Sequence, residues 1–229
     1  MLYINNRLLV LDRILKIYDG FMAQQDIACS KGCAACCTRN VTTTTLEGYR
    51  LMEYMISMGS NEELMAKIEN ESDRPRFVPT LTTNRLAELC MQGEQVPEEK
   101  NDAAWGECPM LKDNQCPVYS ARPFGCRCMV SVSDCRGQSA ASMPDFLLTV
   151  NEVFLQYIEH IDPSGKSGNL TDILIYMSNP DKRNQYLAGN IEDGSSENTL
   201  ISNHPVKMLM IPPEHRERIA PLIESLNRI

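Results

Sequence analysis

The chain has 229 residues, of which 43% are hydrophobic and 23% are charged. This composition is typical of a globular protein with its own core, and it excludes a disordered or collagen-like chain. The formal net charge of −8 argues against a nucleic-acid partner, because such binding depends on neutralising phosphates with basic side chains. No apolar run approaches the ~20 residues that span a bilayer. We therefore expect a soluble protein with no membrane span.

Helical spacing dominates the N-terminal segment, residues 6–26. Leu8, Leu11, Leu15 and Tyr18 recur at the spacing of one face of an amphipathic helix. Charged residues interrupt the segment and no small-residue cleavage site follows it, so it does not have the pattern of a secretory signal peptide. We therefore expect a cytoplasmic protein, in which disulfides are rare.

Two capping boxes of the form Ser/Thr-x-x-Glu predict where the next two helices begin. The first pairs Thr44 with Glu47, and the second pairs Ser60 with Glu63. A further helix is predicted over residues 83–91, where the apolar residues again follow helical spacing and a glycine comes just after.

Regular helices are also predicted closer to the C-terminus, over residues 142–161 and 173–177. A Pro/Gly/Ser-rich loop is expected between them at 162–169. Residues 189–204 are polar and rich in Gly and Ser, which predicts a mobile segment. The last segment predicts a helix that Pro221 interrupts or restarts.

The segment from residue 105 to residue 137 differs from the rest of the chain. Helical periodicity disappears there, and Cys, Pro, Gly and Arg dominate. Two similar tetrads, Cys108-Pro-Met-Leu and Cys116-Pro-Val-Tyr, stand on either side of a polar linker. They predict a small hairpin with its turn at Asp113-Asn114.

These elements predict a mainly α fold: a helical domain with a loop-rich, cysteine-rich metal-binding insert and at most a small β-hairpin. We assign residues 1–162 to a cysteine-cluster domain. Residues 163–229 are expected to form a C-terminal helical extension packed on that same domain, because the length of the chain suits one domain with additions.

The ten cysteines are the most informative residues in the sequence. Nine of them fall in two short windows, residues 29–37 and 108–135, and Cys90 stands apart. A reducing compartment and a full-size core remove the usual need for disulfides, so metal binding is favoured. Sites rich in thiolates select zinc, iron–sulfur clusters or copper(I). Cys90 lies on a predicted helix beside leucines and is expected to be a buried small hydrophobe.

We expect the two windows to complete one shared metal site. In the first window four cysteines fall within nine residues, so several sulfur atoms can face one side of a helix or turn. The second window has no C-x-x-C pair, so a self-contained zinc ribbon is not expected. The candidate ligands are Cys29, Cys33, Cys36 and Cys37 from the first window, and Cys108, Cys116, Cys126 and Cys128 from the second.

Basic residues accompany the second window within an otherwise acidic protein. Residues 108–128 contain three basic residues, Lys112, Arg122 and Arg127, and only one acidic residue, Asp113. Cationic donors stabilise thiolates and hydrogen-bond to cluster sulfurs, so Arg122 and Arg127 are candidates for supporting the bound metal or cluster. The alternative is that both arginines cap a turn or pair with surface acids.

The ordered cysteine pattern resembles a known family. The matching residues are Cys29…Cys33-x-x-Cys36-Cys37, Cys108-Pro109-Met110-Leu111, Cys116-Pro117-Val118-Tyr119 and Arg122-Pro123-x-x-Cys126-Arg127. This combination, which covers roughly residues 29–128, is similar to the YkgJ-type cysteine-cluster family, described as a zinc- or iron-chelating CxxCxxCC domain. The resemblance implies metal binding by every cysteine in the matching pattern.

The sequence departs from that family pattern at two places. Three residues separate Cys29 from Cys33 where the family has two, a variation that the family tolerates. Cys128 stands where an aromatic or aliphatic residue is expected, so it is either an additional ligand or a redox-active neighbour. Flagellin lysine methylases carry a similar cysteine module that is associated with an iron–sulfur cluster, which favours this cofactor here.

Three functions follow from these observations. The first is an iron–sulfur protein, holding a 4Fe–4S cluster for electron transfer or oxidoreductase chemistry with a redox or protein partner. The second is a structural zinc module in an interaction protein. The third is methyl transfer, as in the flagellin enzymes, and it is the least supported because the sequence has no Gly-rich strand-to-helix loop for an adenosine cofactor. No catalytic residue is identified by sequence.

Overall fold

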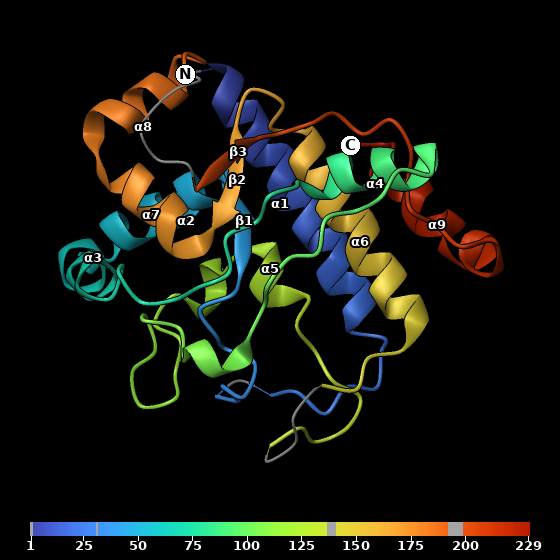
Figure 1. The fold of residues 1–229 in the computed structure, drawn as a ribbon, viewed down its shortest axis with the longest axis horizontal. Helices are drawn as coiled ribbons and strands as arrows, with labels where there is room; N and C mark the ends of the chain where they lie inside the picture. The colour runs from blue at the N-terminus through green and yellow to red at the C-terminus, as the bar shows by residue number, and fades with distance from the viewer. Residues whose placement is uncertain (1, 31, 137–140, 192–198) are drawn as a thin grey trace.

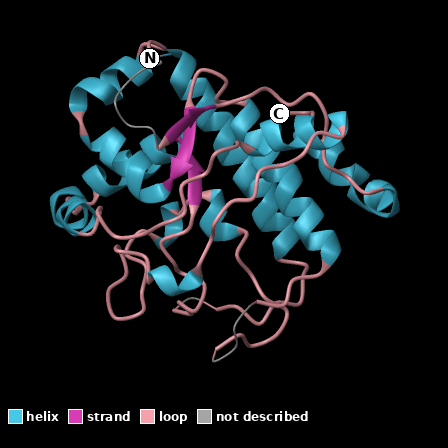
Figure 2. Ribbon diagram, in the orientation of Figure 1, coloured by secondary structure: helices cyan, strands magenta, loops and turns pink. Residues whose placement is uncertain are grey.

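The computed structural model describes residues 2–30, 32–136, 141–191 and 199–229. This described part is mainly helical with one small antiparallel sheet (Figures 1 and 2), which confirms the mainly α class. Over the same residues, no helix combines the length and apolar character needed to cross a membrane.

The longer elements follow one another in a regular order along the chain. They are α1 (Leu2–Met22), β1 (Thr42–Thr44), α2 (Thr45–Ser57), α3 (Asn61–Asn70), α4 (Thr83–Gln92), α5 (Phe124–Arg127), α6 (Asp145–His160), β2 (Lys166–Asn169), α7 (Leu170–Ser178), α8 (Pro180–Leu187), β3 (Leu200–Ser202) and α9 (Arg216–Leu226). Short 3₁₀ turns lie at η1 (Ala103–Trp105), η2 (Tyr119–Ala121) and η3 (Pro213–His215).

The two predicted capping boxes have different outcomes. At the start of α2, the Thr44 side chain accepts from the Glu47 backbone and the Glu47 side chain accepts from the Thr44 backbone, so this box is confirmed. Ser60 precedes α3 but makes no side-chain cap. Its hydroxyl instead lies 3.4 Å from the carbonyl oxygen of Met55 in the preceding helix. The second capping box was therefore wrong, because the hydroxyl points back to α2.

The structure contains a three-stranded sheet, whereas at most a small β-hairpin was expected. Its strands come from three distant parts of the chain and pair antiparallel in the order β1-β2-β3. Residues 162–169 were expected to be a loop, but Lys166–Asn169 forms the middle strand β2. Sequence pattern missed this strand because its residues are polar or small, and it lacks the β-branched and aromatic side chains typical of strands. A Cβ atom at Gly168 would clash with Leu200 of β3.

Other expectations need correction further along the chain. Cys90 is exposed, not buried, because the buried face of α4 is formed by other residues, among them Ala87 and Leu89. The helix α9 continues through Pro221 and is neither interrupted nor restarted there. Helix α8 was not predicted. Within the segment expected to be mobile, residues 192–198 lie outside the described residues, and Leu200–Ser202 forms strand β3.

A buried carboxylate, Asp162, joins the N-terminal and C-terminal parts of the molecule. It accepts hydrogen bonds from the Thr45 hydroxyl at 2.7 Å, the Leu46 N–H at 3.0 Å and the Tyr186 hydroxyl at 3.0 Å. Arg7 of α1 pairs with it at 3.3 Å. Burial raises the pKa of Asp162 to about 6 despite these partners. Residues from α1, α2 and α8 thus converge on one buried group.

An aromatic cluster anchors the cysteine-rich segment to the helical core. Phe124 of α5 is fully buried, and its ring lies 4.7 Å from that of Tyr18 in α1 and 5.8 Å from that of Phe154 in α6, between centroids. Its N–H also donates to Glu47 of α2 at 2.6 Å. Burying a phenylalanine contributes roughly 1.5–3 kcal/mol, so α5 is held in place without a metal.

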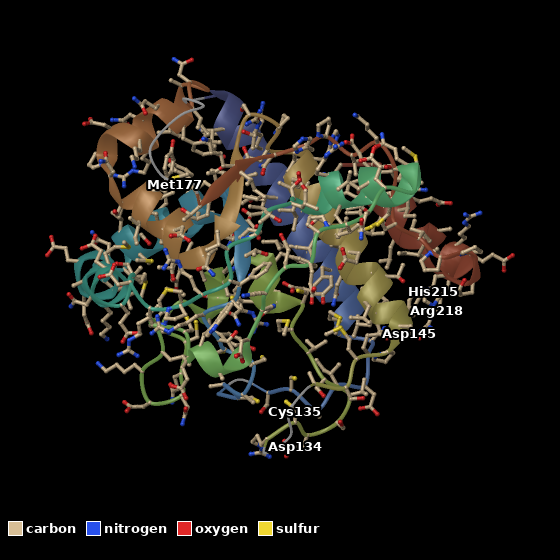
Figure 3. All side chains as sticks on the ribbon, viewed as in Figure 1. Asp134, Cys135, Asp145, Met177, His215 and Arg218 are labelled. Atoms are coloured by element: carbon tan, nitrogen blue, oxygen red, sulfur yellow. The ribbon has the colours of Figure 1, made fainter. Side chains whose placement is uncertain are left out.

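The C-terminal helix packs against the start of α6. His215 lies 2.8 Å from the Thr149 hydroxyl, and the Arg218 guanidinium lies 3.8 Å from the centroid of the Phe146 ring. Figure 3 shows both residues close to Asp145, the first residue of α6. Figure 1 shows α9 at the right-hand side of the molecule and the loop-rich end at the bottom.

The close contact between α2 and α7 gives a stability prediction. A Cβ atom at Gly48 of α2 would clash with the Ile173 side chain of α7, whereas Gly20 of α1 has no neighbour within 4 Å. We expect Gly48→Ala to destabilise the protein by about 1–3 kcal/mol through overpacking. The matched control, Gly20→Ala, should stabilise α1 by about 0.5–1 kcal/mol. Urea unfolding measures both, and a stabilising Gly48→Ala would show that this contact is loose.

Candidate metal centre

The two cysteine windows are joined by backbone hydrogen bonds. Thr38 and Glu107 form an isolated antiparallel bridge, and the Cys108 N–H donates to the Cys37 carbonyl at 2.9 Å. The Arg39 N–H donates to the Gly106 carbonyl at 3.1 Å. The two windows therefore fold onto each other as expected, and backbone hydrogen bonds hold them together. Both windows lie at the loop-rich end of the molecule, below the sheet in Figure 1.

Seven thiols surround one cavity of about 120 Å³, here called the cysteine cavity. Its other walls are mostly apolar and include Ile27, Val41, Met110 and Val118. The cysteines that line it are Cys29, Cys33, Cys36, Cys37, Cys108, Cys116 and Cys126, which are all the cysteines in the family-like pattern.

Tight turns, not a helix, place the thiols of the first window. The Cys33 N–H donates to the Ser30 carbonyl at 3.0 Å, and the Cys37 N–H donates to the Ala34 carbonyl at 2.9 Å. Within the first of these turns Gly32 has a φ of +93°, a conformation that is strained for residues with a side chain. Each turn reverses the chain, so sulfur atoms close in sequence reach the same cavity.

The second window is shaped by the predicted hairpin and by α5. Asp113 and Asn114 have φ values of +51° and +58°, and Lys112 and Gln115 pair through two backbone hydrogen bonds of 3.0 and 2.8 Å. This geometry matches a type I′ turn, in which both central residues have positive φ, so the predicted turn is confirmed. Helix α5 then carries Cys126 two residues after Phe124, the core anchor described above.

Protonation differs among these thiols. The Cys37 thiol donates to Cys36, which lowers the pKa of Cys36 to about 6 and raises the pKa of Cys37. Burial raises the pKa of Cys108, Cys116 and Cys126. Near pH 7 Cys36 is therefore the most ionised of these five, and metal binding at the others must release protons.

The structure separates Cys128 from the other candidate ligands. Its side chain does not line the cysteine cavity but faces a neighbouring one. The thiol lies 3.5 Å from the Gly125 carbonyl, and burial raises the pKa of Cys128 to about 12. Cys135 lines the same neighbouring cavity, on the loop labelled at the lower end of Figure 3. The structure therefore gives Cys128 no place among the seven clustered thiols.

The two candidate arginines, Arg122 and Arg127, make different contacts. Arg122 lines the cysteine cavity and stacks on the Tyr119 ring at 4.0 Å. Its positive charge lowers the pKa values of Cys36, Cys116 and Cys126, against the larger effect of burial at the last two.

Arg127 instead braces the loop. It donates to the carbonyls of Ser120 and Arg122 at 2.9 and 3.0 Å, and pairs with Asp19 of α1 at 3.0 Å. The expected contact with loop carbonyls is present, and so is the pairing with a surface acid that stood as the alternative.

Arg39 is a third arginine at this site, which the ligand pattern did not select. It is buried and pairs with Glu71, and the nearby Cys108 charge acts to raise its pKa, although burial lowers that pKa overall. Over the described residues, the Nε atoms of Arg39 and Arg122 are both buried without a hydrogen-bond partner. Leaving such a donor unpaired costs about 1–3 kcal/mol, so an acceptor in the cysteine cavity, which Arg122 lines and Arg39 does not, would relieve that cost at Arg122. The only signal in the sequence that could have identified Arg39 is its position two residues after Cys37.

The residues fit a thiolate-bound metal by donor chemistry but are not pre-arranged around one. No set of three or more His, Cys, Asp or Glu side chains among the described residues is positioned to hold a metal ion. Binding would require thiols to turn toward a common centre. The cavity of about 120 Å³ is several times the roughly 10–15 Å³ that admits one water molecule. It therefore has room for more than a single ion.

Comparison with known proteins assigns no family to the chain. No family model matches it, and no curated protein or solved structure shows a significant match. The cysteine cavity and its surroundings are therefore the features of this chain that indicate a function.

Proposed function

We propose that this protein binds an iron–sulfur cluster through thiolates of both windows and serves in electron transfer or a related redox reaction. The observation that carries the proposal is the meeting of seven thiols from two distant segments around one cavity. Iron–sulfur clusters are held by cysteine thiolates, four for a 4Fe–4S cluster. That cluster would supply one-electron redox chemistry.

Electrostatic coupling selects four of the seven thiols as the proposed ligands. The pKa of Cys37 is raised by its hydrogen bond to Cys36 and by burial, and then by the charges of Cys36, Cys126 and Cys108. Besides burial, charges on Cys108 and Cys116 raise the pKa of Cys126. Cys108 and Cys126 thus link Cys37 of the first window to Cys116 of the second, and we take these four as the ligands, with Cys36, the strongest partner of Cys37, as the alternative from the first window. Cys29 interacts instead with Cys33, Cys36 and Cys135.

The unpaired arginine donors also support a charged cluster. A 4Fe–4S cluster with four thiolates carries a net charge of about −2 in its usual oxidised state, and hydrogen bonds to its sulfurs tune its potential. Arg122, whose unpaired Nε atom is buried, lines the cysteine cavity, and Arg39 lies close enough to Cys108 for their charges to interact. A structural zinc site needs four thiolates but only the space of one ion, so the cavity volume favours the cluster.

Anaerobic purification tests the proposal directly. We expect a brown protein with broad visible absorption that bleaches on reduction, and about four iron and four sulfide ions per chain. A colourless protein with one tightly bound zinc per chain would contradict the cluster and favour the structural zinc module.

Replacing Arg122 should weaken retention of the bound metal. We expect Arg122→Ala to lower resistance to a chelator by about 10–100-fold, the usual penalty for losing an outer-shell partner. Arg122→Lys keeps the charge but loses the buried Nε donor, so it should fall between Arg122→Ala and wild type. The control is Arg228→Ala, which removes an exposed arginine paired with Glu224 far from both windows in the sequence. Equal chelator resistance in all variants would remove Arg122 from the site.

A further inference from the structure

A larger cavity adjoins the cysteine cavity and has no part in the proposed function. This central cleft encloses about 550 Å³, which lies within the range of about 300–1,000 Å³ typical of small-molecule sites. Four residues line both cavities and so form the wall between them: Cys36, Thr38, Val41 and Met129. A molecule in the central cleft would therefore lie beside the thiol group.

A third cavity extends the central cleft on its other side. It encloses about 280 Å³, and four residues line both: Thr42, Phe77, Glu152 and Leu155. Four carboxylates line the two cavities together, from Glu47, Glu99, Glu152 and Glu159. Of the described residues that line them, none is Lys, Arg or His. The combined space is therefore acidic, and its charge suits a cation.

Three of these four carboxylates are already engaged by the protein. Glu47 accepts from the Thr44 and Phe124 N–H groups. Glu99 accepts from the Thr80 N–H and hydroxyl. Glu159 accepts from the N–H groups of Asn84 and His204.

Glu152 differs from the other three. It is half-buried on α6, and among the described residues its carboxylate has no hydrogen-bond or ion-pair partner, although burial raises its pKa. Desolvating a carboxylate without a partner is unfavourable, and a bound cation would offset that cost. Glu152 also lies where the central cleft and the third cavity meet, within reach of a ligand in either.

The remaining surface of the central cleft suits an apolar body. Phe77, Met143, Leu148 and Leu155 line it. The polar amides there are occupied by the protein: the Asn151 side chain, for example, accepts from the Tyr18 hydroxyl at 2.8 Å and donates to the Cys128 carbonyl at 3.1 Å. Glu152 is thus the lining carboxylate still free to orient a ligand.

We propose that the central cleft binds a small organic cation, an ammonium group on an apolar body, with the ammonium paired to Glu152. The ligand would lie against Cys36 and Met129, next to the cysteine cavity. The site goes beyond the proposed function, because its recognition chemistry needs neither a cluster nor zinc.

Benzylammonium is a suitable probe, and benzyl alcohol is its neutral counterpart of similar shape. Each is titrated into the full-length protein as purified, with its native metal content, while amide resonances are followed by NMR. We expect benzylammonium to shift resonances around Glu152, Leu155 and Phe77 and to bind about tenfold more tightly than benzyl alcohol, because an ionic hydrogen bond is formed. Glu152→Gln should remove this preference.

The control is Glu98→Gln, which removes the same charge from an exposed residue that does not line either cavity. Equal binding of the two probes to wild type, or an unchanged preference in Glu152→Gln, would overturn the proposal, as would shifts confined to another surface. Iron content is measured in the same samples. Normal iron with no amine preference rejects the cation site alone, whereas amine preference in a protein without iron rejects the cluster alone.

Discussion

Cys126→Ser is expected to lose at least nine-tenths of the bound iron and the visible absorption that accompanies it. Cys126 interacts electrostatically with both Cys108 and Cys116, and it is carried by α5, which is fixed in the core through Phe124. Because neighbouring thiols cannot replace it without moving that helix, the loss should be larger than for a ligand on a loop. Serine oxygen is a poor substitute for thiolate toward iron–sulfur clusters.

Two other serine variants are matched controls for this experiment. Cys90→Ser changes an exposed cysteine outside both windows. Cys128→Ser changes a buried cysteine two residues from Cys126 that does not line the cysteine cavity, and its hydroxyl can still donate to the Gly125 carbonyl, as the thiol does. Both should keep wild-type iron. Loss of iron in Cys128→Ser but not in Cys126→Ser would show that the proposed ligand set is wrong.

Cys29→Ser tests which of the seven thiols around the cavity bind the cluster and which do not. The Cys29 sulfur accepts from the Ser131 N–H at 3.2 Å and is not among the four proposed ligands. We therefore expect iron content near wild type in this variant. A loss equal to that of Cys126→Ser would move Cys29 into the ligand set and would require thiols of the first window to turn further into the cavity.

Local signals in the sequence predicted the elements whose structure depends on neighbouring residues alone. The capping box at Thr44 and the left-handed turn at Gly93 set the ends of α2 and α4 as expected, because both act within a few residues. The turn at Asp113-Asn114 formed for the same reason. These features need no information from the rest of the chain.

Features that depend on distant residues were not predicted. Strand β2 has the sequence Lys-Ser-Gly-Asn, and it is a strand because β1 and β3 pair with it from both sides. Cys90 follows helical spacing beside leucines but points to solvent, because packing of α4 on the molecule chooses which face is buried. Spacing alone cannot make that choice.

The sequence predicted most of the cysteines of the candidate site, but it predicted few of the residues around them. Clustering of cysteines in sequence proposed eight ligands, and seven of them, all except Cys128, line one cavity. The position of Cys128 depends on how α5 turns against α6, and Glu152 resembles any polar residue on an amphipathic helix. Neither could be distinguished until the tertiary contacts were known.

Removing the metal should loosen the cysteine segments while the helices persist. Leu11, Leu51, Phe154 and Ile173 are fully buried and belong to one hydrophobic core that needs no thiol. Helical circular dichroism should therefore change little after chelation, unlike that of zinc fingers, which unfold without metal. Complete loss of helicity would show that this core is weaker than its burial implies.

Hydrogen exchange of the stripped protein should show where order depends on the metal. Residues 106–118 are held by turns, by the bridge to the first window and by the buried side chains of Met110 and Val118. Apart from these two anchors, we expect the amides of the segment to exchange about a hundredfold faster without metal. Amides of α5 should change less, because Phe124 anchors that helix between Tyr18 and Phe154. The variant Cys37→Ser should reproduce this pattern and Cys90→Ser should not. Unchanged protection across residues 106–118 would mean that the thiols do not organise the loop, and the metal centre would lose its main structural consequence.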